Sequence, residues 1–306
     1  MKNLDTSIQE YLIIRRSLGY KLKGTESYLY EFADFLMKRK RHTISTALAL
    51  EWIAQPQGRS HTSRAQRLSV VRLFAEFRKI TDPKTEVPPK YLLPCRPRRA
   101  VPHIYSDQEL GQLLRAFLVG GTTELRRCTY YTIFGLLMVT GCRVGEILGL
   151  VVGDVNLRKG FLTIRNAKCG KSRIIPIHPT TAQALKRYVR IRNFYLGSTP
   201  LKRFFVSQFG NPVDAGDLKR LFVKISKKIG LRRAEAHHGP RLHDLRHSFA
   251  VKTILTWYRN EVDVDANMPL LSTYLGHVKP SDTYWYLTGV PELLSLAATR
   301  LEATRR

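Results

Sequence analysis

The sequence feature that most constrains the fold is a proline-rich stretch about one third of the way along the chain. Residues 82–104 read DPKTEVPPKYLLPCRPRRAVPHI and contain six of the 15 prolines. Proline removes a backbone donor and fixes φ, so such a stretch forms neither a helix nor the middle of a sheet. We therefore predict an extended linker at 83–104, between a small domain at 1–82 and a larger domain at 105–306 of this 306-residue chain.

Apolar residues recur at helical spacing four times before this linker. The pattern predicts helices near 5–19, 25–39, 46–54 and 62–80. Short connections between them favour a small helical bundle. The last helix is predicted to turn its apolar residues inward and to carry a basic outer face with Arg64, Arg67, Arg72 and Arg78.

The chain is strongly basic, with 51 Lys and Arg against 24 Asp and Glu and a formal net charge of +27. Residues 1–100 account for +11 of this charge, so it is spread over both halves. Such an excess favours a polyanionic partner such as a nucleic acid, although a basic helix face is also often merely solvated. The candidate phosphate contacts are Arg64 and Arg67 in the last predicted helix and Arg96, Arg98 and Arg99 in the linker.

Other classes of protein fit the composition poorly. The chain has no run of 18 apolar residues, and its first residues lack the apolar segment of a signal peptide, so we expect no membrane association and a cytoplasmic location. The four cysteines form no CxxC pair, which argues against a disulfide framework or a zinc ribbon. We expect free thiols.

The larger domain is predicted to be mainly helical with a small antiparallel sheet. It opens with a capping box, in which Ser106 precedes Glu109 by three residues. The segments 161–166 and 172–178 are rich in β-forming residues and flank the turn KCGK. Helical patterns lie at about 126–140, 180–195 and 214–229.

Four short motifs in this domain carry reactive side chains. They are TGCRVGEILGL at 140–150, AKCGKSRIIPIH at 167–178, HDLRH at 243–247 and LGH at 275–277, and Tyr286 follows the last motif by nine positions. A guanidinium binds phosphate oxygens through a fork of N–H donors, and an imidazole moves protons near neutral pH. A phenol becomes a nucleophile once it is deprotonated. The set is suited to phosphoryl transfer without a metal ion.

These motifs, in this order, resemble the tyrosine recombinase (phage integrase) family over about residues 104–300. The resemblance implies a helical core-binding domain followed by a catalytic domain, which together grip duplex DNA. It implies cleavage and rejoining of DNA through a covalent 3′-phosphotyrosine, without ATP or any other cofactor. Four protomers would exchange two duplexes through a four-way junction, so the protein is expected to be a homo-oligomer on DNA.

The resemblance also implies a role for each reactive side chain. Arg143 and Arg246 clamp the scissile phosphate, and Tyr286 attacks it. His243 accepts the proton of the phenol, and His277 donates a hydrogen bond to a non-bridging oxygen.

Three further assignments follow from the same resemblance. Lys168, at the predicted hairpin turn, protonates the departing 5′-oxygen, with Lys171 as the alternative. Glu146 lies one helical turn after Arg143 and is expected to orient a neighbouring side chain rather than to react. The segment 291–303 is expected to form a helix that packs on a neighbouring protomer.

Several alternatives stay open at this point. Tyr284, two residues before Tyr286, is a second candidate nucleophile. His243 and His247 are four residues apart, but without the glutamate of a metalloprotease motif, so we predict no metal site. A type IB topoisomerase uses the same chemistry without partner exchange, and a catalytically silent DNA-binding protein would also be basic. The TYWYLTG context of Tyr286 resembles integrases of mobile elements, which favours DNA integration or excision.

Overall fold

The chain divides into two compact units, Met1–Ala100 and Val101–Arg306, called here the N-terminal and the C-terminal unit. The boundary falls inside the proline-rich stretch 83–104. The computed structural model describes residues 3–55, 58, 60–93, 101–119, 123–165, 172–197, 201–236, 238–277 and 279–288, with the single positions 293, 295 and 298.

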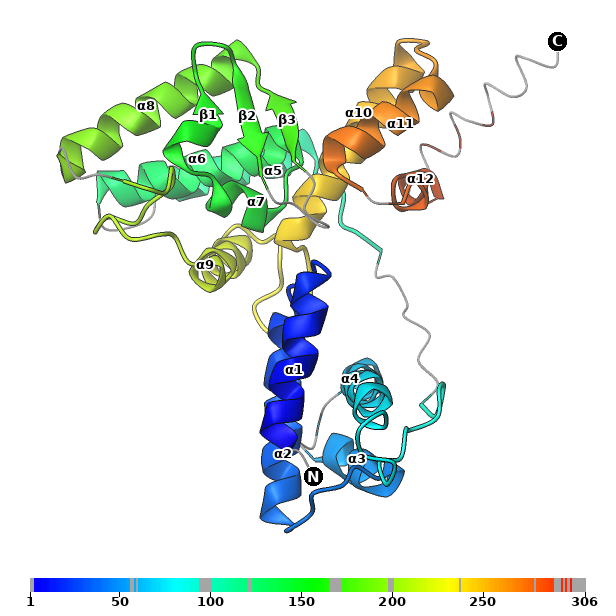
Figure 1. Ribbon diagram of the computed structural model, residues 1–306. Coiled ribbons are helices and arrows are strands. Elements are labelled where there is room, and N and C mark those ends of the chain that lie inside the picture. The colour runs from blue at the N-terminus through cyan, green and yellow to red at the C-terminus, as the bar shows by residue number, and fades with distance from the viewer. Residues whose placement is uncertain are drawn as a thin grey trace. The chain divides into compact units, whose positions relative to one another are not determined.

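The described part of the N-terminal unit is a bundle of four helices (Figure 1). They are α1 (Leu4–Ser17), α2 (Lys23–Lys38), α3 (Thr46–Ala54) and α4 (His61–Arg78). Ser45 and Ser60 cap α3 and α4, because each hydroxyl accepts a hydrogen bond from a backbone N–H in the first turn. Buried aromatic rings join the helices, as where Phe32 and Trp52 lie 5.2 Å apart between ring centroids. The four predicted helices are confirmed.

The predicted basic face of α4 is wrong at two positions, because Arg67 and Arg78 are both buried. The Arg67 guanidinium packs 3.7 Å from the centre of the Trp52 ring and forms an ion pair of 3.0 Å with Glu31. Arg78 lies 3.5 Å from the carboxylate of Asp82. Helical periodicity could not reveal this, because a long side chain at the edge of the apolar face reaches inward wherever a carboxylate or an aromatic ring receives it.

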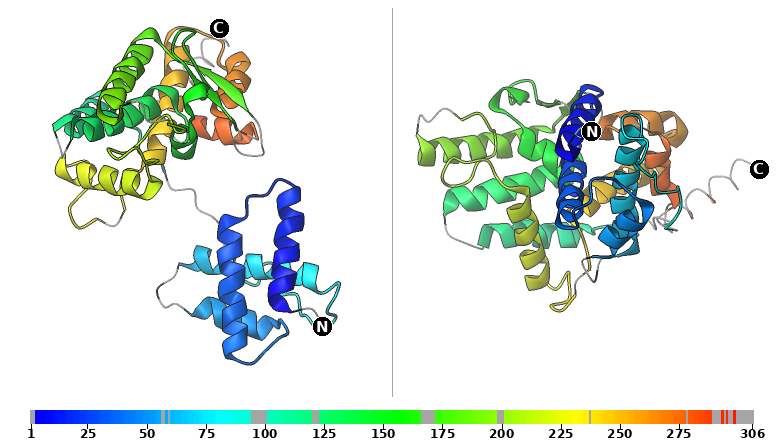
Figure 2. Two further views of the ribbon diagram at one scale, coloured as in Figure 1. Left: turned by 60° about the vertical axis from the view of Figure 1, so that its left-hand side comes forward. Right: turned by 60° about the horizontal axis from the view of Figure 1, so that its bottom comes forward.

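The C-terminal unit joins helices to one small sheet (Figures 1 and 2). Strands β1 (Val155–Asn156), β2 (Phe161–Ile164) and β3 (Arg173–Pro176) form an antiparallel sheet in the order β1-β2-β3, with Leu162 opposite Ile175. The predicted pair of strands is confirmed, with shorter bounds. Its turn, which contains Lys168, Cys169 and Lys171, lies outside the described residues. The helices before the sheet are α5 (Asp107–Val119), α6 (Glu124–Thr140), α7 (Val144–Gly149) and the 3₁₀ turn η1 (Val152–Asp154).

The helices after the sheet are α8 (Pro179–Leu196), α9 (Ala215–Lys228), α10 (Leu242–Arg259), α11 (Val264–Leu275) and α12 (Ser281–Thr288). The predicted capping box is confirmed, because Ser106 and Glu109 each accept a hydrogen bond from the other's backbone N–H. Helix α11 contains Pro269, which removes one helical hydrogen bond and makes a helix hard to predict there. It forms nonetheless, because Met268 and Leu271 are buried in the core that α10, α11 and α12 share.

The helix α6 lies at the centre of the larger core of this unit, in contact with α5, α8 and α10. A second core joins α10 to α11 and α12, so α10 belongs to both. In the part of the chain that the structure describes, no helix has the length and apolar character needed to cross a bilayer. The arrangement brings the ends of α6 and α11, the start of α7 and the face of α12 to one side of α10.

Candidate active site

Arg246 is the buried centre of the candidate site. It lies on α10 with 2% of its surface exposed. Its guanidinium donates hydrogen bonds to the carbonyl oxygens of Gly141, at 2.9 Å, and Leu275, at 2.6 Å. These carbonyls are at the C-terminal ends of α6 and α11, where backbone oxygens lack partners within the helix. Burial, and then the charge of Arg143, lowers the pKa of Arg246.

Two glycines allow these helix ends to approach α10 and β3. Gly141 ends α6 at φ +59°, and a Cβ atom there would lie 2.6 Å from the Phe249 ring. Gly276 ends α11 at φ +68°, and its Cβ would lie 2.8 Å from a guanidinium nitrogen of Arg173. A side chain at either position would therefore be strained and would collide with its neighbours. The glycines of the TG and LG dipeptides thus shape the site without reacting.

Arg143 lies immediately before α7, where its backbone is extended rather than helical. Its guanidinium donates to Glu146 at 2.9 Å and to the carbonyl of Gly276 at 3.1 Å. The prediction that Arg143 lies at a helix start is confirmed. The Glu146 carboxylate touches Arg143 as the spacing predicted, while its supporting role in the reaction stays a prediction.

Glu146 is held between two arginines. It accepts hydrogen bonds from Arg143 and from Arg173, the latter at 2.8 and 3.1 Å. Burial opposes its ionisation, but the hydrogen bonds from Arg173 and Arg143 outweigh burial and lower its pKa to about 2. Glu146 is therefore a carboxylate at neutral pH.

Arg173 is a residue of the site that the sequence reasoning missed. It starts β3, is bound to Glu146, and donates to the carbonyl of Tyr274 at 2.7 Å. It therefore ties the hairpin to the end of α11 and to the start of α7. The signal that could have found it is the arginine of the AKCGKSRIIPIH motif at 167–178.

Tyr286 lies on α12 with 2% of its surface exposed. Burial raises its pKa, whereas the charge of Arg246 and a hydrogen bond from it act in the opposite direction. Its ring centroid lies 5.3 Å from that of His247 and 6.0 Å from that of His277. Tyr284, the alternative nucleophile, is 41% exposed and so is oriented differently.

The three histidines of the candidate site, His243, His247 and His277, are neutral near pH 7. Burial, and then the charge of Arg246, lowers the pKa of His243 and of His277, the latter to about 4. Burial, and then His243, lowers the pKa of His247 to about 4. The rings of His243 and His247 lie 4.8 Å apart, so His247 contacts both His243 and Tyr286. The sequence reasoning gave His247 no role.

Of the remaining predicted residues, two are in the N-terminal unit and four are not among the described residues. Arg64 is partly exposed on α4, in the N-terminal unit, and Arg67 is buried there. The predicted catalytic lysine, Lys168, and the linker arginines Arg96, Arg98 and Arg99 lie outside the described residues. Within the described residues, no group of three His, Cys, Asp or Glu side chains could hold a metal ion.

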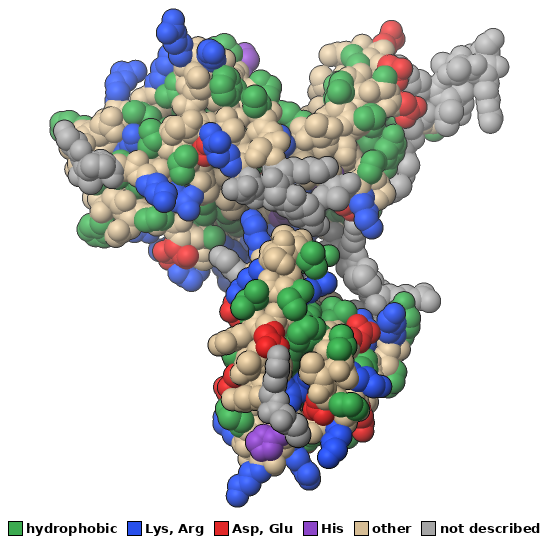
Figure 3. All heavy atoms as spheres, in the orientation of Figure 1, with side chains coloured by type: hydrophobic (Ala, Val, Ile, Leu, Met, Phe, Trp, Pro, Cys, Tyr) green, Lys and Arg blue, Asp and Glu red, His purple; other side chains and the backbone are tan. Residues whose placement is uncertain are grey.

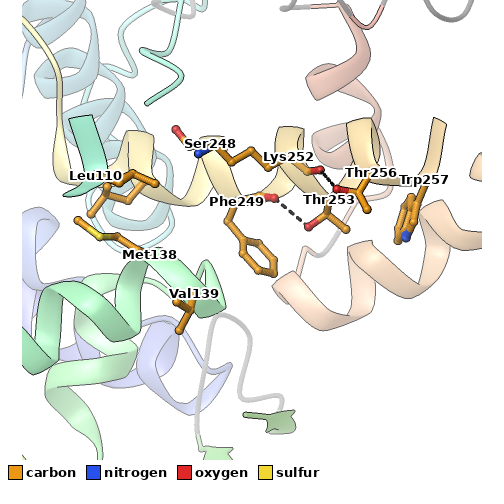
Figure 4. Close-up of a pocket in the computed structure, with 10 residues that line it drawn as sticks. Leu110, Met138, Val139, Ser248, Phe249, Lys252, Thr253, Thr256 and Trp257 are labelled. Carbon is orange, nitrogen blue, oxygen red and sulfur yellow. Dashed lines mark hydrogen bonds between the residues drawn. The ribbon is translucent and has the colours of Figure 1, made fainter. Parts of the chain in front are cut away.

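A separate groove of about 340 Å³ lies along α10 (Figure 4). Its α10 residues include Leu245, Phe249 and Lys252, and α6 contributes Met138 and Val139. None of the candidate site residues lines this groove. The groove is therefore distinct from the candidate active site.

The chain belongs to the phage integrase family, the tyrosine recombinases, which are DNA strand-transferases, because residues 107–290 match that family's sequence profile. It is 45% identical to a "Putative integrase/recombinase y4rB" of Sinorhizobium fredii, over 99% of this chain and 98% of that protein. It is 30% identical to "Tyrosine recombinase XerD" of Staphylococcus haemolyticus, over 92% of this chain and 94% of the relative.

Solved structures share the fold at lower identity. The Tn1549 transposon integrase in complex with transposon right end DNA gives a TM-score of 0.67 at 18% identity, covering 98% of this chain and 99% of that one. The XerH site-specific recombinase bound to difH DNA, in its post-cleavage complex, gives a TM-score of 0.64 at 20% identity, covering 90% and 78%. The predicted class of fold, mainly helical with a small antiparallel sheet, is confirmed.

Proposed function

We propose that this protein is a site-specific recombinase that cleaves and rejoins duplex DNA through a 3′-phosphotyrosine at Tyr286. The observation that carries the proposal is the buried phenol of Tyr286, hydrogen-bonded to a buried arginine, Arg246, whose other hydrogen bonds go to backbone carbonyls. A charge that carbonyls hold but do not neutralise attracts an anion. The scissile phosphate is that anion.

Arg246 and Arg143 stabilise the charge that develops on the non-bridging oxygens. Both are held before substrate binds, Arg246 by two carbonyls and Arg143 by Glu146 and Gly276. Donors fixed in advance cost no reorganisation when the phosphate becomes pentacovalent, and each contributes roughly 10²–10³ in rate.

Deprotonation of Tyr286 needs a base, because burial raises the pKa of the phenol. We assign this role to His243, whose lowered pKa keeps the imidazole free to accept a proton at neutral pH. His247 contacts the rings of both His243 and Tyr286 and can help to position them. His277 donates a hydrogen bond to a non-bridging oxygen.

The departing 5′-oxygen takes a proton from Lys168, an assignment that rests on the KSRIIPI motif alone. The covalent bond conserves the energy of the phosphodiester, so rejoining a strand needs neither ATP nor a metal ion. We expect equal activity in EDTA and in Mg²⁺; a strict metal requirement would contradict this step.

The biological task that we propose is integration or excision of a mobile element by four protomers on paired DNA sites, in the cytoplasm. Two observations support it. The structural neighbours include an integrase of a transposon and a lambda integrase tetramer bound to a Holliday junction. Lys and Arg side chains are also spread over the surfaces of both units (Figure 3).

Covalent trapping tests the chemistry. A nicked duplex carrying the element's attachment site is incubated with the protein and run on a denaturing gel. We expect a shifted band for the wild type and for Tyr284→Phe, and none for Tyr286→Phe. A band that survives in Tyr286→Phe would overturn the nucleophile assignment. Relaxation of supercoiled DNA without strand exchange would favour a topoisomerase, and tight binding without any adduct would favour a silent DNA-binding protein.

Truncation tests the assembly. Residues from Pro291 onward are predicted to pack on a neighbouring protomer, and most of them lie outside the described residues. We expect their deletion to preserve binding to a single site and to weaken pairing of two sites in a gel-shift assay. Unchanged pairing would contradict that role.

A further inference from the structure

Thr283 is a fully buried hydroxyl that the proposed reaction leaves without a role. It lies on α12, three residues before Tyr286, and its Oγ1 is 2.7 Å from Nδ1 of His277. Its backbone N–H donates to the carbonyl of Pro280 at 2.8 Å, so the start of α12 fixes its position. Because the Thr283 side chain is fully buried, water does not compete for its hydroxyl. The short distance therefore indicates a direct hydrogen bond to His277.

The distance alone fits two arrangements, because a neutral imidazole carries its proton on one nitrogen only. If the proton is on Nδ1, the ring donates to Thr283, and the buried hydroxyl hydrogen finds no acceptor among the described residues. If the proton is on Nε2, the hydroxyl donates to Nδ1 and both groups are satisfied. Since an unsatisfied buried donor is costly, the second arrangement is favoured.

We propose that Thr283 is a positioning residue that holds His277 in the tautomer with its proton on Nε2. The inference rests on the proposed function, in which His277 must donate to a non-bridging phosphate oxygen. Only the tautomer with a proton on Nε2 presents a donor there, whereas the other would direct a lone pair at the anion.

Two further observations fit this assignment. The pKa of His277 is lowered to about 4, so the ring is neutral at pH 7 and its tautomer matters. The backbone N–H of His277 donates to the carbonyl of Ser272 at 3.0 Å, which fixes the backbone at this position. Rotation of the imidazole ring remains free, and the hydrogen bond with the Thr283 hydroxyl restrains it.

The same short helix carries the nucleophile and the hydroxyl. Thr283 and Tyr286 are both buried, and three residues along a helix place them on one face. When α12 packs against α10 and α11, it therefore positions the phenol of Tyr286 and the hydroxyl of Thr283 together. A protomer whose α12 is displaced would lose the nucleophile and the correct His277 tautomer at once.

The tautomer is measured directly on the full chain without DNA. Protein labelled with ¹⁵N-histidine is examined by long-range ¹H–¹⁵N correlation at pH 7, with the His277 signals assigned by their loss in His277→Gln. We expect the pattern of a ring protonated on Nε2 in the wild type and in Thr283→Ser. Thr283→Val, which keeps the shape and removes the hydroxyl, should shift the ring toward a mixture of tautomers.

Activity is measured in parallel with the nicked duplex. We expect Thr283→Val to slow adduct formation by about tenfold to a hundredfold, as for other residues that orient a reacting group, with DNA affinity unchanged. Thr283→Ser should restore most of the rate. The matched control is Thr273→Val, because that exposed hydroxyl on α11 donates to the Pro269 carbonyl and should affect neither measurement.

Different results would contradict the role of Thr283 and the proposed function. A wild-type ring protonated on Nδ1, or a Thr283→Val variant with unchanged tautomer and unchanged rate, would overturn the role of Thr283. A wild type that forms no adduct at Tyr286 would overturn the proposed function, while the DNA-free spectra would still decide the hydrogen bond. Circular dichroism of each variant separates these results from misfolding.

Discussion

Buried arginines occur in both units, but their partners differ. In the N-terminal unit, Arg67 and Arg78 each face a carboxylate, from Glu31 and Asp82. In the C-terminal unit, Arg246 is as buried, and it donates hydrogen bonds to two backbone carbonyls and to the phenol of Tyr286. Among the described residues, no carboxylate forms an ion pair with it within 4.0 Å.

For these three arginines, we propose that the difference separates a structural charge from one that serves the proposed reaction. A carboxylate partner cancels the charge of an arginine and makes the pair part of the fold. A carbonyl satisfies the N–H donors but leaves the positive charge available to an incoming anion. The lowered pKa of Arg246 fits this interpretation, since burial and Arg143 destabilise its charge in the absence of DNA.

The largest expected effect is on cleavage by Arg246→Lys. Lysine keeps the charge but loses the planar fork, so we expect the rate of adduct formation to fall by roughly 10²–10³. The matched control is Arg67→Lys, which alters a buried arginine of the other unit and should leave the rate of folded protein unchanged. Equal losses in the two variants would remove the distinction between the two kinds of buried arginine.

Next is the stability effect of Arg78→Met. It leaves Asp82 buried without its ion pair, and breaking such a pair costs about 3–5 kcal/mol of unfolding free energy. Urea unfolding measures the loss, and Arg78→Met combined with Asp82→Leu should recover part of it. If the double variant is no more stable than the single one, the charge of Asp82 is not the cause.

A smaller effect is expected from Glu146→Gln. The amide keeps the shape but loses the charge that holds Arg143 and Arg173, so we expect adduct formation to slow by about tenfold to a hundredfold. Glu109→Gln is the control, since Glu109 caps α5 in the same unit. A rate unaffected by Glu146→Gln would mean that the carbonyl of Gly276 suffices to orient Arg143.

The last prediction concerns the pH dependence of stability. The folded-state pKa of His247 and of His277 is lowered from 6.5 to about 4, so the unfolded chain binds more protons between these values. The contribution of these two histidines to the unfolding free energy should therefore fall as pH drops below about 6.5 and level off near pH 4.

The contribution of Glu146 lies in a different window. Its pKa is lowered from 4.5 to about 2, so its stabilising effect persists above pH 4.5 and is lost as pH falls toward 2. Thermal unfolding between pH 8 and 5 should thus report the histidines alone. A His247→Phe, His277→Gln double variant that keeps the wild-type slope would contradict this assignment.

Sequence patterns anticipated much of the fold and part of the site. The helices of the N-terminal unit, the capping box at Ser106 and the paired strands follow from local spacing and turn chemistry. The sequence patterns did not predict α11, because Pro269 obscures a helix whose stability comes from packing against α10. The sequence patterns also placed Arg78 outside the bundle, because two of its hydrogen-bond partners, Ser7 and the carbonyl of His42, lie far from it in the chain.

The sequence by itself determined the reactive groups: two arginines, a tyrosine and histidines, at spacings that identify the family. Only the tertiary structure decided how each group is held. Arg246 meets the ends of two helices, α6 and α11, that lie far from it in the chain. Thr283 meets His277 because the start of α12 folds back onto the end of α11. Hydrogen-bond partners depend on atoms within about 3 Å in space, and no local pattern encodes which distant carbonyl or hydroxyl arrives there.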